Sequence, residues 1–127
     1  MTSIEVPYSI AAALPTLSVM DITNDVAQSI ARSDRSNGIA YISATDGLSL
    51  VRVQEREAGF FCDVEELLKR LIPLEMGGRE RMLLALLGPR TEAIPFQAGR
   101  LCLGTWQRIL MVGFNGAPAD WSLTFVG

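Results

Sequence analysis

The run GRLCLGTWQRILMVGFNG, residues 99–116, contains two kinds of sequence pattern and decides most of the fold. In its first half, Gly99 and Gly104 favour turns or bulges in the backbone. Leu101 and Leu103 alternate with other residues and are expected to point inward. The first half therefore predicts a strand with at least one irregular position.

The second half of the run is continuously apolar at residues 109–112, ILMV. A strand with one face in water normally alternates apolar and polar residues, so this run is too apolar for an exposed strand and indicates a buried sheet. We predict one strand over 101–113, covered by a subunit contact. Trp106 is expected to be a core or interface anchor.

Two helices are predicted upstream of this run. The sequence DITNDVAQSIARS, residues 21–33, has Asp21 or Thr23 as a possible cap and an apolar residue at every fourth position. The sequence DVEELLKRLI, residues 63–72, has Asp63 and Glu66 at capping-box spacing. The apolar face of this second helix is expected to contain Val64, Leu67, Leu68 and Leu71.

The remaining segments predict strands. They are residues 3–10, 16–20, 38–43, 48–53, about 90–96 and 121–126. Helices and strands do not alternate strictly in this order, so the pattern is α+β rather than doubly wound. The 127 residues fit one domain, 1–127, because the sequence shows no repeat or low-complexity linker.

The composition leaves a surplus of apolar surface. Apolar residues make up 49% of the chain, and the mean hydropathy is +0.27, although a small domain buries a modest share of its surface. No apolar run reaches the roughly 18–20 residues of a spanning helix, so no membrane association is expected. Contacts between copies of the chain are the expected outlet.

The charges argue against nucleic acid as a partner. The formal net charge is −3, and the basic residues are dispersed rather than clustered. No signal peptide is evident, so the expected location is the cytoplasm. Cys62 and Cys102 are expected to be buried thiols, although the sequence does not exclude a disulfide between them.

The chain contains no histidine, which limits its chemistry. It lacks the side chain that titrates near neutral pH and the usual base for a Ser or Cys nucleophile. Two cysteines alone cannot supply a structural zinc site, so neither metal nor cofactor is expected. The loop GGRER, residues 77–81, could hold an anion through Arg79 and Arg81, or be an exposed loop with solvated arginines.

Several motifs resemble the YjbQ-like family, which is also labelled secondary thiamine-phosphate synthase. They are DITNDV (21–26), NGI (37–39), LLKRLIP (67–73), LLG (86–88), IPF (94–96), GRLCLGTWQ (99–107) and FNGAP (114–118). The resemblance implies an α+β fold with two small, mostly antiparallel sheets, two main helices and the order ββαββαβββ. It also implies a homotrimer and, for the family, the joining of a pyrimidine diphosphate to a thiazole phosphate.

The sequence departs from the family where the family has polar site residues. The family motif Pro-His-Thr-Thr corresponds here to Ser43, Ala44, Thr45 and Asp46, so Ala44 takes the histidine position. Arg81 takes a second histidine position. The family signature thus persists while its histidines are absent, which indicates a degenerate active site.

Three functions follow from this comparison. The first is an uncharacterised, non-catalytic trimeric scaffold or interaction protein with no catalytic residue. The second is a rebuilt pocket for a small anionic metabolite. The candidate pocket residues are Thr45, Asp46, Arg81, Thr105 and Gln107. The third is an enzyme of the family type, using arginines on the diphosphate.

Overall fold

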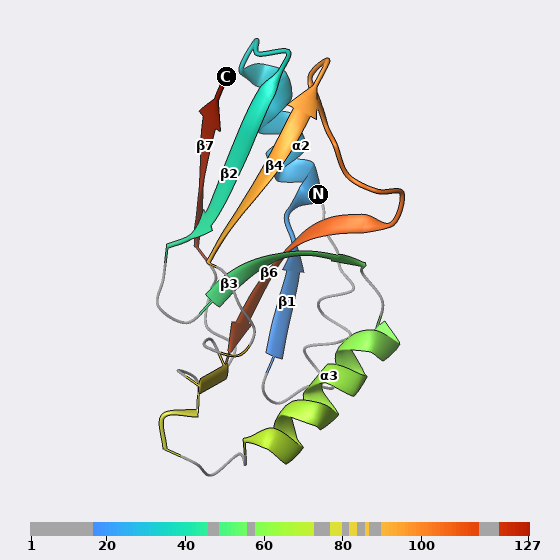
Figure 1. Cartoon of the computed structure of the whole chain (residues 1–127), viewed down its shortest axis with the longest axis vertical. Coiled ribbons are helices and arrows are strands. Elements are labelled where there is room, and N and C mark those ends of the chain that lie inside the picture. The colour runs from blue at the N-terminus through green and yellow to red at the C-terminus, as the bar shows by residue number, and fades with distance from the viewer. Residues whose placement is uncertain are drawn as a thin grey trace.

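The computed structural model contains two antiparallel sheets and two main helices (Figure 1). It describes residues 17–45, 49–55, 58–72, 77–79, 82–83, 86, 90–114 and 120–127. The α+β fold expected from the sequence is confirmed. The predicted strand over residues 3–10 lies outside the described residues.

A three-stranded sheet has the order β1-β6-β3, with β6 in its centre. Its strands are β1 (Leu17–Asp21), β3 (Ser49–Glu55) and β6 (Gln107–Phe114). Both outer strands run antiparallel to β6, with Val19 and Leu50 opposite Val112.

A four-stranded sheet has the order β5-β4-β2-β7. Its strands are β2 (Gly38–Ala44), β4 (Thr91–Gln97), β5 (Arg100–Leu101) and β7 (Trp121–Val126). Helix α2 (Thr23–Arg32) lies behind this sheet in Figure 1 and packs Val26 and Ile30 into the same apolar cluster as its inward residues.

Strand β6 is covered on both faces. Leu110 and Val112 belong to a core cluster with Leu68 and Ile72, from helix α3 (Ala58–Leu71) and the residue that follows it. The alternate residues of β6, Ile109 and Met111, belong to the cluster that contains α2 and the four-stranded sheet. The continuous burial of residues 109–112 was therefore predicted correctly. The expectation of a subunit contact was wrong, because elements of the same chain cover both faces.

The predicted strand over 101–113 is interrupted. The N–H of Gln107 donates to the carbonyl oxygen of Gly104 at 3.1 Å, which closes a turn between β5 and β6. Trp106 lies in this turn and is 74% exposed, so it is not a core residue. A role for it at an interface stays a prediction.

Helix α3 begins five residues earlier than the capping box predicts, at Ala58. Asp63 therefore lies inside the helix. A cap contributes only about 1 kcal/mol, and the sequence between residues 58 and 63 contains no proline that would end a helix.

The buried face of α3 also differs from the prediction. Leu68 is 2% exposed, whereas Leu67 and Leu71 are more than half exposed. The buried side instead includes Glu65 and continues to Ile72 just after the helix. Both cysteines, Cys62 and Cys102, are free and exposed, so the prediction of buried thiols was wrong.

The variants Leu68→Ala and Leu71→Ala make the same replacement on α3, so they change helix propensity equally. Any difference between their free energies of unfolding therefore reports the burial of the two leucines. Leu68→Ala should lower the free energy of unfolding by about 2–5 kcal/mol through loss of core contacts. Leu71→Ala should change it by about 0.5 kcal/mol or less, because Leu71 is 58% exposed. Urea unfolding of both variants measures the difference. Equal losses would contradict the described packing of α3.

Candidate functional site

Ala44, which the sequence comparison predicts to stand at a family histidine position, ends strand β2 and pairs with Trp121 of β7. Its side chain is 5% exposed and belongs to the apolar cluster beneath the four-stranded sheet. Its N–H donates to the carbonyl oxygen of Arg90 at 2.8 Å. The backbone of this position is therefore held by the sheet, and its side chain faces the core.

Polar groups surround this end of β2. The N–H of Thr45 donates to the carbonyl oxygen of Asp120 at 2.9 Å, and the Arg90 guanidinium approaches the Ala44 carbonyl at 3.3 Å. On the outer face of the sheet, the hydroxyls of Ser43 and Thr91 are 2.8 Å apart. Thr45 itself is exposed. Two other candidates, Asp46 and Arg81, lie outside the described residues.

Gln107 has a local structural contact. Its side-chain Oε1 accepts a hydrogen bond from the N–H of Gly104 at 2.8 Å. Together with the backbone bond from Gln107 to Gly104, this contact closes the turn from both directions. Thr105 is exposed in the same turn. Gln107 therefore shapes the entry into β6.

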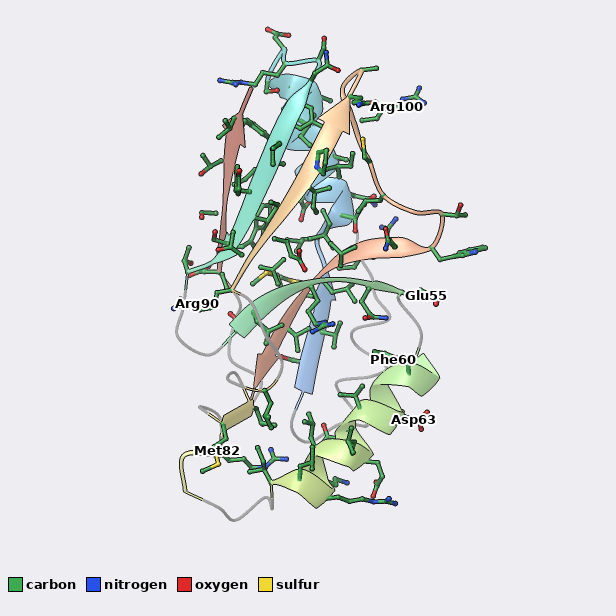
Figure 2. The ribbon with its side chains drawn as sticks, in the orientation of Figure 1. Glu55, Phe60, Asp63, Met82, Arg90 and Arg100 are labelled. Carbon is green, nitrogen blue, oxygen red and sulfur yellow. The ribbon has the colours of Figure 1, made fainter. Side chains whose placement is uncertain are left out.

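The structure places Thr45 far from Thr105 and Gln107. Thr45 follows β2 in the four-stranded sheet, while Gln107 opens β6 and pairs with Glu55 of the other sheet. In Figure 2, Arg90 beside the end of β2 and Glu55 beside the start of β6 lie on opposite sides of the molecule. These candidate residues therefore do not form one pocket.

One of the two predictions for the loop 77–81 was that its arginines are exposed and solvated. Arg79 does not fit this prediction. It is buried, and its Nε donates to the carbonyl oxygen of Ile72 at 3.0 Å. This carbonyl lies just after α3, where helix carbonyls lack intrahelical partners and attract cations. The position of Arg79 thus stabilises the end of α3.

A buried polar network joins β1, α2 and β6. The sequence analysis did not predict it. Asp21 is almost fully buried, and its Oδ1 accepts hydrogen bonds from the N–H and the hydroxyl of Thr23 at 2.9 and 2.6 Å. Its Oδ2 lies 2.7 Å from Nε of Arg108. The Thr23 hydroxyl also accepts the N–H of Ile109 at 2.8 Å.

The network keeps Asp21 ionised. Burial raises the pKa of this carboxyl, but the hydrogen bonds from Arg108 and Thr23, with the Arg108 charge, more than offset burial. The pKa therefore lies below its ordinary value of 3.8. An ionised carboxylate whose two oxygens are occupied by protein donors is suited to hold three elements together, rather than to transfer protons.

The sequence analysis proposed Asp21 or Thr23 as the cap of α2, which was wrong, because Ile22 is the N-cap residue and no side chain caps the helix. The two residues bond to each other at the start of α2 instead. Arg108 could not be assigned to them because it is 87 residues away in sequence. Its only local signal is a charged residue directly before the apolar run 109–112.

Among the described residues, no three His, Cys, Asp or Glu side chains converge to hold a metal ion. No helix in the described part of the chain is long and apolar enough to cross a membrane.

Comparison with known proteins identifies related chains. A family model described as "UPF0047 protein YjbQ-like" matches residues 12–124. A UPF0047 protein of Archaeoglobus fulgidus is 28% identical over 106 residues, which cover 77% of this chain and 82% of the relative.

Solved structures share the fold. A hypothetical protein of Aeropyrum pernix K1 has a TM-score of 0.75 and 27% identity, over 87% of this chain and 90% of that chain. An uncharacterised yjbq/upf0047 family protein of Clostridium acetobutylicum has a TM-score of 0.76 and 19% identity, over 99% of this chain and 96% of that chain.

We expect Asp21→Asn to destabilise the protein at neutral pH by about 1–3 kcal/mol, because charge-assisted hydrogen bonds are lost. The folded pKa of Asp21 lies below the ordinary 3.8, so its contribution is complete above pH 3.8 and is lost as pH falls through the folded pKa. The difference between wild type and variant should shrink between about pH 5 and pH 2. Urea unfolding at both pH values measures it, and a gap that stays constant contradicts the assignment.

Gln107→Ala should lower the free energy of unfolding by about 0.5–1.5 kcal/mol, because the turn loses the acceptor for Gly104. Gln107→Glu keeps an acceptor oxygen and should retain most of the stability. Thr105→Ala is the matched control in the same turn and should have little effect. Thermal unfolding compares the three variants, and a fully stable Gln107→Ala would show that the turn does not depend on this contact.

Proposed function

Because the chain belongs to the UPF0047 YjbQ-like family, we propose that it is a non-catalytic member that acts as a trimeric scaffold or interaction protein. The observation that supports this most strongly is the environment of Ala44. The resemblance aligns Ala44 with a family histidine, and the small side chain of Ala44 is turned into an apolar core cluster. The inherited fold can persist without the inherited chemistry.

The chemistry of the family label needs groups that this position lacks. Alanine can neither accept a proton nor bind a metal, and the chain contains no histidine that could replace it. The ionised carboxylate of Asp21 already bonds Thr23 and Arg108. These facts favour the non-catalytic proposal over an enzyme of the thiamine-phosphate synthase type.

The alternative of a rebuilt pocket for a small anionic metabolite draws less support. Gln107 uses its side-chain oxygen within its own turn, and Thr45 follows β2 of the four-stranded sheet, whereas that turn leads into β6 of the other sheet. A binding role would have to rely on the arginine and hydroxyl groups near the end of β2. The experiment below includes anionic ligands for this reason.

Assembly as a homotrimer and a cytoplasmic location are parts of the same proposal. Three large apolar side chains, Phe60, Leu67 and Leu71, are exposed along α3 and offer surface for contacts between copies. In Figure 2, Phe60 lies near the start of this helix. Two free cysteines on the surface fit a reducing compartment.

The test combines an activity assay with a ligand screen. Purified protein is incubated with the pyrimidine diphosphate and the thiazole phosphate, with an established thiamine-phosphate synthase as positive control. No product above the protein-free background is expected. Thermal shift with phosphate, diphosphate and carboxylates should show no stabilisation, whereas a ligand at a hundredfold excess over its Kd would add about 2.7 kcal/mol. Reproducible product formation contradicts the non-catalytic role, and a clear shift supports the binding alternative instead.

A further inference from the structure

Strand β7 forms an edge of the four-stranded sheet. Within the part of the chain that the structure describes, its only strand partner is β2. Figure 1 shows β7, in dark red, on the outer side of β2. The strand spans the six residues Trp121–Val126.

The hydrogen bonds at the end of β2 show which backbone groups of β7 face outward. The N–H of Thr45 donates to the carbonyl oxygen of Asp120, while the N–H of Ala44 donates to Arg90 on the opposite side of β2. Residues of an antiparallel ladder alternate between hydrogen-bonded and non-hydrogen-bonded pairs. The β7 residues whose N–H and C=O groups point away from β2 are therefore Trp121, Leu123 and Phe125.

The residues of β7 themselves lack the features that usually prevent strand pairing between molecules. Exposed edges are commonly protected by short length, charged side chains, proline or bulges. Strand β5 is two residues long, and β3 contains Arg52 and Glu55. The sequence of β7, WSLTFV, contains neither a charge nor a proline.

We propose that β7 pairs in antiparallel orientation with β7 of a second copy of this chain, about a two-fold axis at Leu123. The four-stranded sheet then continues across the contact into the sheet of the second copy. This inference concerns the sheet edge and does not depend on the absence of catalysis.

The register about Leu123 uses every outward backbone group of β7. Leu123 exchanges hydrogen bonds with the partner's Leu123, and Trp121 exchanges them with the partner's Phe125. Shifting the axis to Thr124 would place Trp121 opposite the partner's Gly127, beyond the end of the strand. Shifting the pairing register of the two strands by one residue would instead turn the apolar side chains of one copy to the opposite face of the sheet.

The side chains match in this register. Trp121, Leu123 and Phe125 are partly buried against the core beneath the sheet, so pairing extends that core across the contact. Trp121 meets the partner's Phe125, which is a favourable cross-strand aromatic pair. On the outer face, exposed Ser122 meets the partner's Thr124. Two negatively charged copies can approach here because no charged residues of β7 oppose each other.

The two-fold pairing predicts an even number of copies. Single chains would form a dimer, and two trimers would join into a hexamer. The mass of the particle in solution therefore distinguishes the two contacts: a trimer has no β7 pairing, whereas a dimer or a hexamer is expected with it.

Disulfide trapping tests the register. The exposed Cys62 and Cys102 are first replaced by serine, and Ser122→Cys and Thr124→Cys are made separately in that background. Ser122 and the partner's Thr124 form a non-hydrogen-bonded pair with Cα atoms about 4.5 Å apart, which a disulfide can bridge. An oxidised mixture of the two variants should form the linked dimer about a hundredfold faster than either variant alone, since pairing raises the effective thiol concentration to about millimolar.

Ala93→Cys in the same background is the matched control, because Ala93 is exposed on β4 of the same sheet. It should link no faster than unpaired thiols. Linking of Thr124→Cys with itself would overturn the register about Leu123. Equal rates for the mixture, the single variants and the control would overturn pairing through β7. Circular dichroism confirms that each variant is folded.

Leu123→Pro provides a second test of the same contact. Proline removes the outward N–H of Leu123 but leaves the hydrogen bonds between β7 and β2, as edge strands tolerate. The mass by light scattering should fall to half that of the wild type. An unchanged mass in a folded variant overturns the proposal. A wild-type trimer without β7 cross-links would also overturn pairing through β7, but it would agree with the proposed trimeric scaffold.

Discussion

The burial of β6 on both faces is the constraint on which the rest of the fold depends. Residues 109–112 are almost inaccessible in the single chain because α3 covers one face and the second sheet covers the other. Such a strand must be apolar at every position, and its neighbours β1 and β3 must supply matching apolar residues. The two helices are therefore placed on opposite sides of β6, each with its own core cluster.

The network around Asp21 acts where this apolar layer ends. Arg108 and Ile109 are consecutive residues of β6, and both bond to groups at the junction of β1 and α2. A buried carboxylate is tolerated only when it is fully paired, so its position fixes the alignment of the three elements. The apolar run determines which strand is central, and the network determines where that strand meets α2.

Sequence patterns predicted those features that depend on neighbouring residues. The strand spanning Gly38–Ala44, the helix beginning near Thr23 and the burial of residues 109–112 all follow from local periodicity. Local periodicity carries no information about contacts between residues that are distant in sequence. Such contacts determine which face of α3 is buried around Leu68, and they pair Asp21 with Arg108. The candidate pocket shared this limitation, because Thr45 follows a strand of one sheet and Gln107 begins a strand of the other.

Because the side chain of Ala44 is buried in the core, the functional groups of this protein are expected on its surface. The side chain of Ala44 belongs to the core, while the chain keeps apolar groups exposed on α3 and an uncharged edge at β7. A strand edge without charge or proline, such as that of β7 among the described residues, favours unwanted pairing unless a specific partner occupies it. The proposed pairing with a second copy would remove that hazard and extend the core, and it would account for both the composition of β7 and the apolar surplus of the chain.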